Sequence, residues 1–211
     1  MLKAIKKNGL TLALFACAST GLVAITNALT EDQIDQQQKA QLKSVLNQVI
    51  SPRMHDNDLA NACTLVTHPS LGSDKPMPVY IATLDGQPSA VAIESVAPDG
   101  YNGAIQLITG ITADGTVSGT RVLAHAETPG LGDKIDLRVS DWILSFTGKT
   151  VTPENESSWK VRKDGGQFDQ FTGATITPRA VVKAVKHTVE YVNSHWQTIV
   201  NQPQTCGGSN E

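Results

Sequence analysis

The first feature of the hydrophobic pattern is a run of 21 residues without a charged side chain, from Gly9 to Leu29. As a helix rising about 1.5 Å per residue, this run would be roughly 31 Å long, close to the thickness of a bilayer's hydrocarbon core. Three lysines precede it, and Glu31 and Asp32 follow it. Because basic residues stay on the cytoplasmic side, the pattern predicts a cytoplasmic segment at 1–8, a transmembrane helix at 9–29 and an extracytoplasmic domain at 30–211.

Two cleaved forms compete with this anchor. A secretory signal peptide needs a small-x-small cleavage site, and Thr26-Asn-Ala28 is a poor version of one. A lipoprotein signal would end at Cys17, but Phe15 is too bulky for that processing site, and uncharged residues continue well beyond the cysteine. The length of the apolar run favours the uncleaved anchor.

Beyond the anchor, helical periodicity flanks a central β region. Thr30 and Gln33 form a capping box for a first helix, which the Ser51-Pro52 step should end. A long second helix should follow Pro178. The apolar stripes of the two helices are Ile34, Leu42, Val45, Leu46, Val49 and Ile50, and Val181, Val182, Val185, Val189, Val192 and Trp196.

Alternating apolar residues around two Asp-Gly steps predict two hairpins between these helices. A glycine-rich loop at Pro98–Gly103 joins the hairpins, a short helix should begin near Asp133 or Asp141, and Lys160–Arg162 should form a further strand. The resulting class is α+β, with a mostly antiparallel sheet and flanking helices. The expected hairpin strands are Val79–Leu84 with Ala90–Val96, and Ala104–Ile111 with Val117–Ala124.

Charge, cysteine content and histidine spacing limit the possible partners and binding sites. All 20 acidic residues but only 14 of the 17 basic ones lie from residue 30 onward, and an acidic domain without basic clusters does not favour nucleic acid as a partner. In an oxidising compartment Cys63 and Cys206 would pair and fasten the C-terminal tail to the start of the domain; two unrelated thiols stay an open alternative. His187 and His195 lie too far apart to bind one metal ion, and no other cluster has metal-ligand spacing, so no metal site is expected.

The segment Asp169–Pro178 contains the most specific chemistry, Asp-Gln-Phe-Thr-Gly-Ala-Thr-Ile-Thr-Pro. Thr177 suits the cap of a helix and Pro178 its first position. A helix start favours a phosphate, and Gly173 lets the backbone approach a ligand closely. Taken alone, the same residues also fit a threonine-rich turn leading into a capped surface helix.

This segment resembles the flavin-attachment motif of the FMN-binding domain family, and the loop His125-Ala-Glu-Thr-Pro-Gly-Leu-Gly132 is similar to a second motif of that family. The resemblance spans about residues 95–200. It implies FMN attached through its phosphate to Thr175, and it makes His125 a weaker candidate for a flavin contact. The other implied cofactor contacts are Thr172, Gly173, Ala174 and Thr177 near the phosphate, and Glu127 and Thr128 near the ring or ribityl chain.

Members of this family relay electrons within multisubunit, ion-translocating oxidoreductases. The resemblance therefore implies a redox subunit of the bacterial inner membrane, with its domain in the periplasm and other membrane and redox subunits as partners. A separate flavin transferase would load the FMN, because a threonine hydroxyl needs an activated phosphoryl donor. The chain has no Gly-x-Gly-x-x-Gly fingerprint and no catalytic residue is assigned, so it would not be a complete enzyme alone.

Two alternatives stay open at this point. Within the family, the short chain and its Thr-Gly-Ala-Thr core are more similar to the Rnf/Rsx members than to the longer flavin-bearing subunit of the sodium-translocating NADH:quinone reductase, which remains the alternative member. A function of another class is a flavin-free extracytoplasmic binding or scaffold domain.

Overall fold

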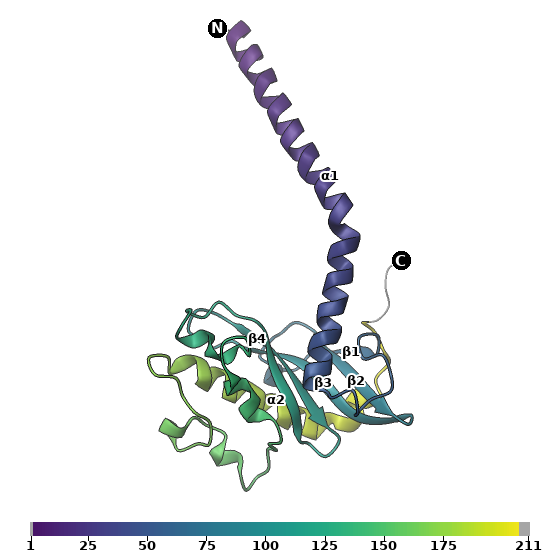
Figure 1. Ribbon diagram of the computed structural model, residues 1–211, viewed down its shortest axis with the longest axis vertical. Coiled ribbons are helices and arrows are strands. Elements are labelled where there is room, and N and C mark those ends of the chain that lie inside the picture. Colours follow the sequence, from purple (N-terminus) through teal and green to yellow (C-terminus); the bar gives the residue numbers. More distant parts are fainter. Residues whose placement is uncertain (1, 207–211) are drawn as a thin grey trace. The chain divides into compact units, whose positions relative to one another are not determined.

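The computed structural model describes residues 2–206 and divides the chain into two compact units, one up to Leu42 and the other from Lys43 onward (Figure 1). The outermost residues of the predicted segments 1–8 and 30–211, namely 1 and 207–211, lie outside the described residues. The first unit belongs to helix α1 (Leu2–Val49). Within the described residues, the segment Ile5–Glu31 of this helix is the one long and apolar enough to cross a membrane.

The predicted helix start at Thr30 is wrong. Thr30 lies inside α1, and its hydroxyl donates to the carbonyl of Thr26, 2.9 Å away. No glycine or proline interrupts the sequence between Leu22 and Ser51, so nothing stops the helix from propagating through the expected boundary. The predicted end is confirmed, since α1 stops at Val49, just before the Ser51-Pro52 step.

The second unit is built on a five-stranded antiparallel sheet in which neighbours in sequence are neighbours in space. Both predicted hairpins are confirmed, and the turn at Asp85-Gly86 has the two positive φ angles, 53° and 75°, that a tight hairpin turn requires. The strands are β1 (Cys63–Val66), β2 (Met77–Leu84), β3 (Gln87–Ala97), β4 (Ile105–Thr112) and β5 (Val117–Ala124).

The strand predicted at Lys160–Arg162 is wrong. Val161 makes one isolated bridge to Phe168, and Arg162 already begins a 3₁₀ helix, η5 (Arg162–Asp164). Gly165 and Gly166 turn the chain too soon for an extended ladder. The expected short helix is present at both suggested places, as the 3₁₀ helices η2 (Gly132–Ile135) and η3 (Asp141–Phe146).

Helices cover both faces of the sheet, which confirms the α+β class. On one face lies α2 (Ile176–Val200), drawn in yellow-green in Figure 1. Its valine stripe belongs to the same hydrophobic core cluster as Val79, Ile93 and Leu107. The stripe residues Val181, Val185, Val189 and Val192 are fully buried.

On the opposite face of the sheet, small residues pack against the end of α1, from Lys43 onward. Leu46 and Val49 are buried there, and a Cβ atom at Gly119 would lie 3.0 Å from the Cα of Val49. Arg121 of β5 donates to Gln48 at the end of this helix, 2.9 Å from Nε to Oε1. Small residues are therefore required where the helix approaches the strands so closely.

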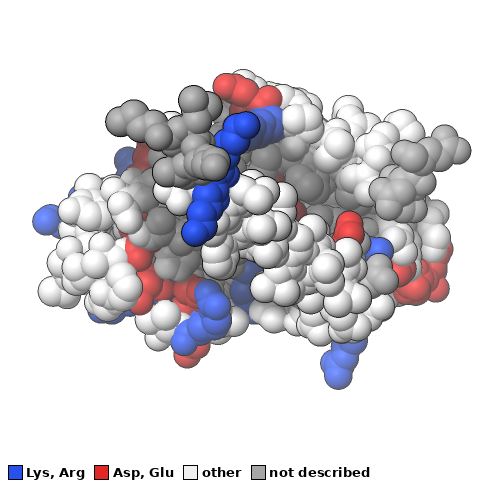
Figure 2. Space-filling view, turned by 90° about the horizontal axis from the view of Figure 1, so that it is seen from above, with Lys and Arg blue, Asp and Glu red and all other residues white. Residues whose placement is uncertain are grey.

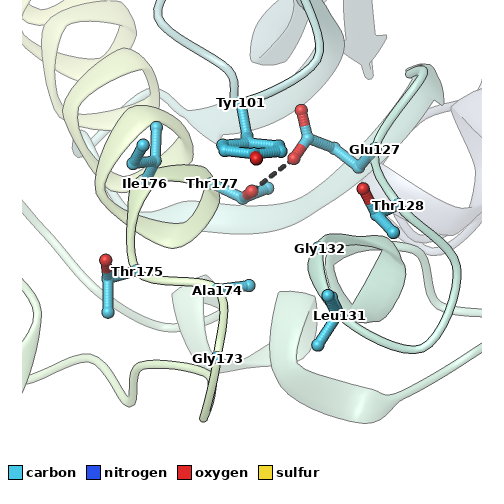
Figure 3. Close-up of a pocket in the computed structure, with 10 residues that line it drawn as sticks. All are labelled: Tyr101, Glu127, Thr128, Leu131, Gly132, Gly173, Ala174, Thr175, Ile176 and Thr177. Atoms are coloured by element: carbon cyan, nitrogen blue, oxygen red, sulfur yellow. Dashed lines mark hydrogen bonds between the residues drawn. The ribbon is translucent and has the colours of Figure 1, made fainter.

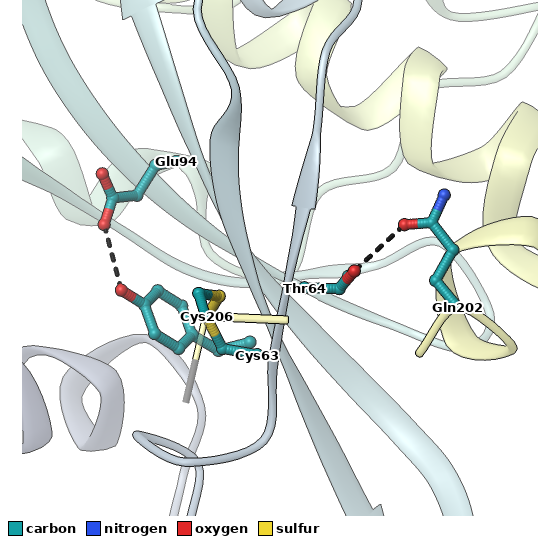
Figure 4. The surroundings of a disulfide bond; sticks show 6 residues. Cys63, Thr64, Glu94, Gln202 and Cys206 are labelled. Carbon is teal, nitrogen blue, oxygen red and sulfur yellow. Dashed lines mark hydrogen bonds between the residues drawn. A yellow bond between two sulfur atoms is a disulfide. The ribbon is translucent and has the colours of Figure 1, made fainter. Parts of the chain in front are cut away.

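A disulfide joins Cys63, in the edge strand β1, to Cys206, in the tail that follows α2 (Figure 4). The tail is also hydrogen-bonded to this strand. The N–H of Thr205 donates to the carbonyl of Cys63 at 2.9 Å, and the Thr64 hydroxyl donates to Gln202 at 3.1 Å. Together these contacts form a clasp (residues Cys63, Thr64, Gln202, Thr205 and Cys206) that covers part of the edge.

Charged side chains of both signs are interspersed on the face seen in Figure 2. Several basic residues around α2 are paired with nearby carboxylates at 2.6–2.8 Å, which offsets their positive charge locally. These pairs are Arg179 with Asp164, Lys183 with Asp99, and Lys186 with Glu156.

Candidate functional site

Three separate segments enclose a cavity of about 320 Å³ at the start of α2 (Figure 3). They are the loop between β3 and β4, the loop after β5, and the turn that precedes the helix. A cavity of this size is at the small end of the range for ligand pockets. Its lining residues are Tyr101, Glu127, Thr128, Leu131, Gly132, Gly173, Ala174, Thr175, Ile176 and Thr177.

The turn before α2 is closed by a hydrogen bond from the N–H of Ala174 to the carbonyl of Phe171, 3.3 Å long. Gly173 has a φ of 82°, a left-handed conformation that favours glycine at this position of a turn. A Cβ atom there would also come within 3.2 Å of the Leu131 side chain. Gly173 therefore serves both the shape of the turn and the close approach of the loop that carries Leu131.

Thr175 occupies the N-cap position of α2 but makes no side-chain capping bond. Its side chain is partly exposed, and in Figure 3 it leaves the backbone on the side opposite to Ala174. The first N–H groups of any helix lack partners within the helix, so at this start they stay available to a ligand.

The predicted roles of Thr177 and Pro178 in starting the helix are wrong. The helix begins at Ile176, which puts Thr177 second and Pro178 third within its first turn. Proline fits there because an N–H at that position would have no helical partner. Thr177 is 1% exposed, and its hydroxyl donates to Oε2 of Glu127 instead of capping the helix.

Glu127 lies in the loop after β5 and accepts a hydrogen bond from each of the other two segments that line the cavity. It is 5% exposed, and its Oε1 accepts the N–H of Asn102, 3.1 Å away, while its Oε2 accepts the Thr177 hydroxyl. A Cβ atom at Gly132 would lie 2.6 Å from Oε2, so glycine is needed beside the carboxylate. Glu127 lines the cavity, but both of its oxygens already have protein partners; its contact with a ring or ribityl chain stays a prediction.

Thr128 is exposed at the cavity, and its carbonyl accepts the N–H groups of Leu131 and Gly132, both at 3.1 Å. These bonds close the Pro-Gly turn of the loop, and Thr128 is one of the residues that line the cavity. Its contact with a cofactor also stays a prediction.

Each ring nitrogen of His125 has a polar neighbour within the protein. Nδ1 accepts the N–H of Glu127 at 3.1 Å, and Nε2 lies 3.8 Å from the carboxylate of Asp136. Hydrogen bonds from Arg138 to that carboxylate hold the pKa of Asp136 below its usual value. His125 therefore orients the loop and does not line the cavity.

The structure brings most of the predicted site residues together. Gly173, Ala174, Thr175 and Thr177 line the cavity with Glu127 and Thr128, whereas Thr172 is exposed and does not line it. Asp169, upstream in the same motif, forms an ion pair with Arg162 at 3.0 Å. Sequence reasoning did not select Tyr101, Leu131, Gly132 and Ile176 as lining residues, although the glycine-rich loop and the second motif contain three of them.

The histidines of α2 have other neighbours. His195 stacks on Tyr191 with ring centroids 4.6 Å apart, and His68 packs against both rings. Among the described residues, no group of three or more His, Cys, Asp or Glu side chains has the arrangement of a metal site.

Comparison with known proteins gives consistent results for both units. A family model described as the RnfG N-terminal region matches residues 1–49, and one described as the FMN-binding domain matches residues 100–190. Several curated proteins are similar along nearly the whole chain, and each is called the G subunit of an ion-translocating oxidoreductase complex.

The relative from Vibrio vulnificus (strain YJ016) is 70% identical over 211 residues, covering 100% of both chains. The one from Vibrio cholerae serotype O1 (strain ATCC 39541 / Classical Ogawa 395 / O395) is 67% identical over 208 residues, covering 99% of this chain and 100% of its own. The one from Aliivibrio fischeri (strain MJ11) is 56% identical over 207 residues, covering 98% and 99%.

Proposed function

Because the chain belongs to the RnfG family of ion-translocating oxidoreductase complexes, we propose that it is an anchored flavoprotein that relays electrons within such a complex. The family expected from the two motifs is thereby confirmed. The chain acts as one redox subunit of a translocase, alongside other membrane and redox subunits. The observation that carries the proposal is the cavity at the start of α2, which lies inside the matched FMN-binding domain.

We propose Thr175 as the covalent attachment point of FMN. Its hydroxyl makes no capping bond, and it borders a cavity that glycines keep open. The linkage to Thr175 would be a phosphodiester with one negative charge. No lysine or arginine is among the described lining residues, so the uncapped N–H groups of the α2 start are the groups that would stabilise this charge.

The flavin ring would supply the redox chemistry, and the protein would supply position and environment. Attachment to Thr175 requires a donor such as FAD, whose pyrophosphate is cleaved by a separate transferase. The threonine oxygen bonds to the phosphorus of the FMN half, AMP leaves, and the hydroxyl proton passes to a base of the transferase. Thr175 is then a modified residue and has no catalytic role in its own attachment.

We propose that residues 1–8 lie in the cytoplasm, that residues 9–29 span the bacterial inner membrane, and that residues 30–211 lie in the periplasm. The apolar segment Ile5–Glu31 of α1 and the lysines near its start support this orientation. Covalent attachment of FMN would be useful in the periplasm, because FMN lost outside the cytoplasm is not readily replaced.

The first experiment co-expresses the full chain with a flavin transferase and measures flavin fluorescence of the band on a denaturing gel. The wild type should fluoresce, Thr175→Val should be dark because no oxygen remains to esterify, and Thr175→Ser should keep a signal. Thr198→Val is the matched control, since this exposed threonine lies near the other end of α2, does not line the cavity and should leave the band fluorescent.

Two results would contradict the proposal. A fluorescent Thr175→Val band would mean that another residue bears the flavin. A dark wild-type band, with the transferase shown to be active on another substrate, would favour a flavin-free binding or scaffold domain.

A further inference from the structure

Three of the exposed large apolar side chains of the domain line the cavity. Tyr101 is 68% exposed, Ile176 46% and Leu131 41%, and each comes from a different one of the three segments that line it. Large apolar side chains grouped at the mouth of a cavity are typical of a ligand site. The other described large hydrophobic residues exposed beyond Lys43 are Leu65, Leu84, Val139 and Leu144, and none of these lines the cavity.

Tyr101 is exposed, but the backbone that carries it is held in place. The N–H of the next residue, Asn102, donates to Glu127, and its side-chain amide donates to the carbonyl of Ala126 at 2.6 Å. Gly100, on the other side, is packed closely: a Cβ atom there would lie 3.0 Å from Oε1 of Glu127. The backbone is therefore held in place on both sides of Tyr101, although the Tyr101 side chain itself is mostly exposed to solvent.

The Glu127 carboxylate also fixes the loop of Tyr101 relative to Thr175, the proposed attachment point of the flavin. Oε2 of Glu127 accepts the hydroxyl of Thr177, two residues after Thr175 in the first turn of α2. The loop of Tyr101 and the start of α2 are thus both hydrogen-bonded to the buried carboxylate of Glu127. In Figure 3 Tyr101 and Leu131 lie on opposite sides of the group of lining residues, and Ile176 lies at the start of α2.

We propose that Tyr101 is the residue that packs its ring against the isoalloxazine of the flavin tethered at Thr175, with Leu131 and Ile176 as its apolar borders. This inference rests on the proposed function. A flat aromatic group held by a short tether gains from an adjacent aromatic face, because offset stacking adds to the burial of both rings. A ring already held in position loses little conformational freedom when the flavin docks.

The test is flavin fluorescence in the folded protein. An electron-rich phenol in contact with a flavin quenches its emission, whereas a denatured chain releases the quench. The full chain is purified in detergent after co-expression with the transferase, and the emission of the native sample is divided by that of the same sample after denaturation. This ratio does not depend on how much flavin was attached.

Tyr101→Ala should raise the native-to-denatured ratio by about threefold, because the stacking partner is gone. Tyr101→Phe keeps the packing with a poorer electron donor and should lie between wild type and Tyr101→Ala. Val139→Ala, which shortens an exposed apolar side chain that does not line the cavity, should match the wild type.

A ratio for Tyr101→Ala equal to that of the wild type overturns the inference and leaves the proposed function standing. If Tyr101→Ala does not fold, Tyr101→Phe decides: a ratio above wild type supports the contact, and an unchanged ratio overturns it. A wild-type band without covalent flavin overturns the proposed function itself, so the two failures are distinguishable.

Discussion

Glu127 is a buried carboxylate whose charge is balanced by hydrogen-bond donors. Among the described residues, no lysine or arginine forms an ion pair with it, and its partners are the N–H of Asn102 and the hydroxyl of Thr177. A buried charge is tolerated only when its oxygens are satisfied. Each of the two donors therefore offsets part of the cost of burying this carboxylate among the three segments that line the cavity.

Thr177→Val keeps the shape of the side chain but leaves one oxygen of Glu127 without its partner. The free energy of unfolding should fall by about 1–3 kcal/mol. Thr188→Val is the matched control, because this equally buried hydroxyl donates to the carbonyl of Ala184 within its own helix, and its loss should cost less. Urea titration of the full chain in detergent, followed by tryptophan fluorescence, measures both; equal losses would contradict the special role of Thr177.

The residues of the site were predictable where a local motif contained them. Gly173, Thr175 and Glu127 belong to two such motifs, and both reach the cavity. The buried bond between Glu127 and Thr177 was not predictable, because it joins residues 50 positions apart and only the fold brings them together. The same holds for Tyr101, whose loop meets the others through long-range contacts.

At the scale of elements, the secondary-structure predictions were correct where a segment's own sequence determines its structure. The Asp-Gly turns predicted both hairpins, and the valine stripe predicted α2. They failed where the context decides. Strand β1 has only four residues and exists because β2 pairs with it, and the helix start predicted at Thr30 was wrong because no breaker separates the two parts of α1.

Tyr80 of β2 and Glu94 of β3 show how pairing of elements perturbs a side chain. The Tyr80 hydroxyl donates to Oε1 of Glu94 at 3.3 Å. Burial raises the pKa of Glu94, although the hydrogen bond from Tyr80 opposes that shift. Burial also raises the pKa of Tyr80, and the charge of Glu94 adds to the effect.

A raised pKa means that the folded chain binds a proton at Glu94 more tightly than the unfolded chain does. Ionisation of Glu94 then costs stability at pH values above the pKa that this group has in the unfolded chain, and the cost is relieved as the pH falls. Glu94→Gln should therefore raise the melting temperature at pH 7 by about 1–2 °C and give no advantage near pH 4.

Thermal melts at the two pH values check this expectation. Glu154→Gln is the control, because a hydrogen bond from Thr152 lowers the pKa of Glu154, and its removal should give no rise at pH 7. A Glu94→Gln variant less stable than wild type at pH 7 would show that the hydrogen bond to Tyr80 outweighs the cost of burial.

At the scale of the whole domain, the clasp connects the end of the chain to its first strand. The bond between Cys63 and Cys206 closes a loop with a sequence separation of 143 residues, which contains all five strands of the sheet and all of α2. Cross-linking so long a loop restricts the unfolded chain strongly.

Cys206→Ser should lower the stability of the domain by about 2–4 kcal/mol. For a domain of this size the melting temperature should fall by roughly 5–15 °C. Cys17→Ser is the matched control, because Cys17 is exposed in α1 and forms no disulfide, so its melting temperature should equal that of the wild type. Scanning fluorimetry of the tryptophan emission compares them, and an unchanged Cys206→Ser variant would show that the hydrogen bonds of the tail are sufficient.

The length of α2 separates two groups that can both accept electrons. The proposed flavin tether, Thr175, immediately precedes its first residue, and the clasp with its disulfide follows its last turn. Its 25 residues extend over about 37 Å, which is far too long for direct contact between the two groups. The helix would thus keep a flavin attached at Thr175 out of contact with the disulfide bond between Cys63 and Cys206.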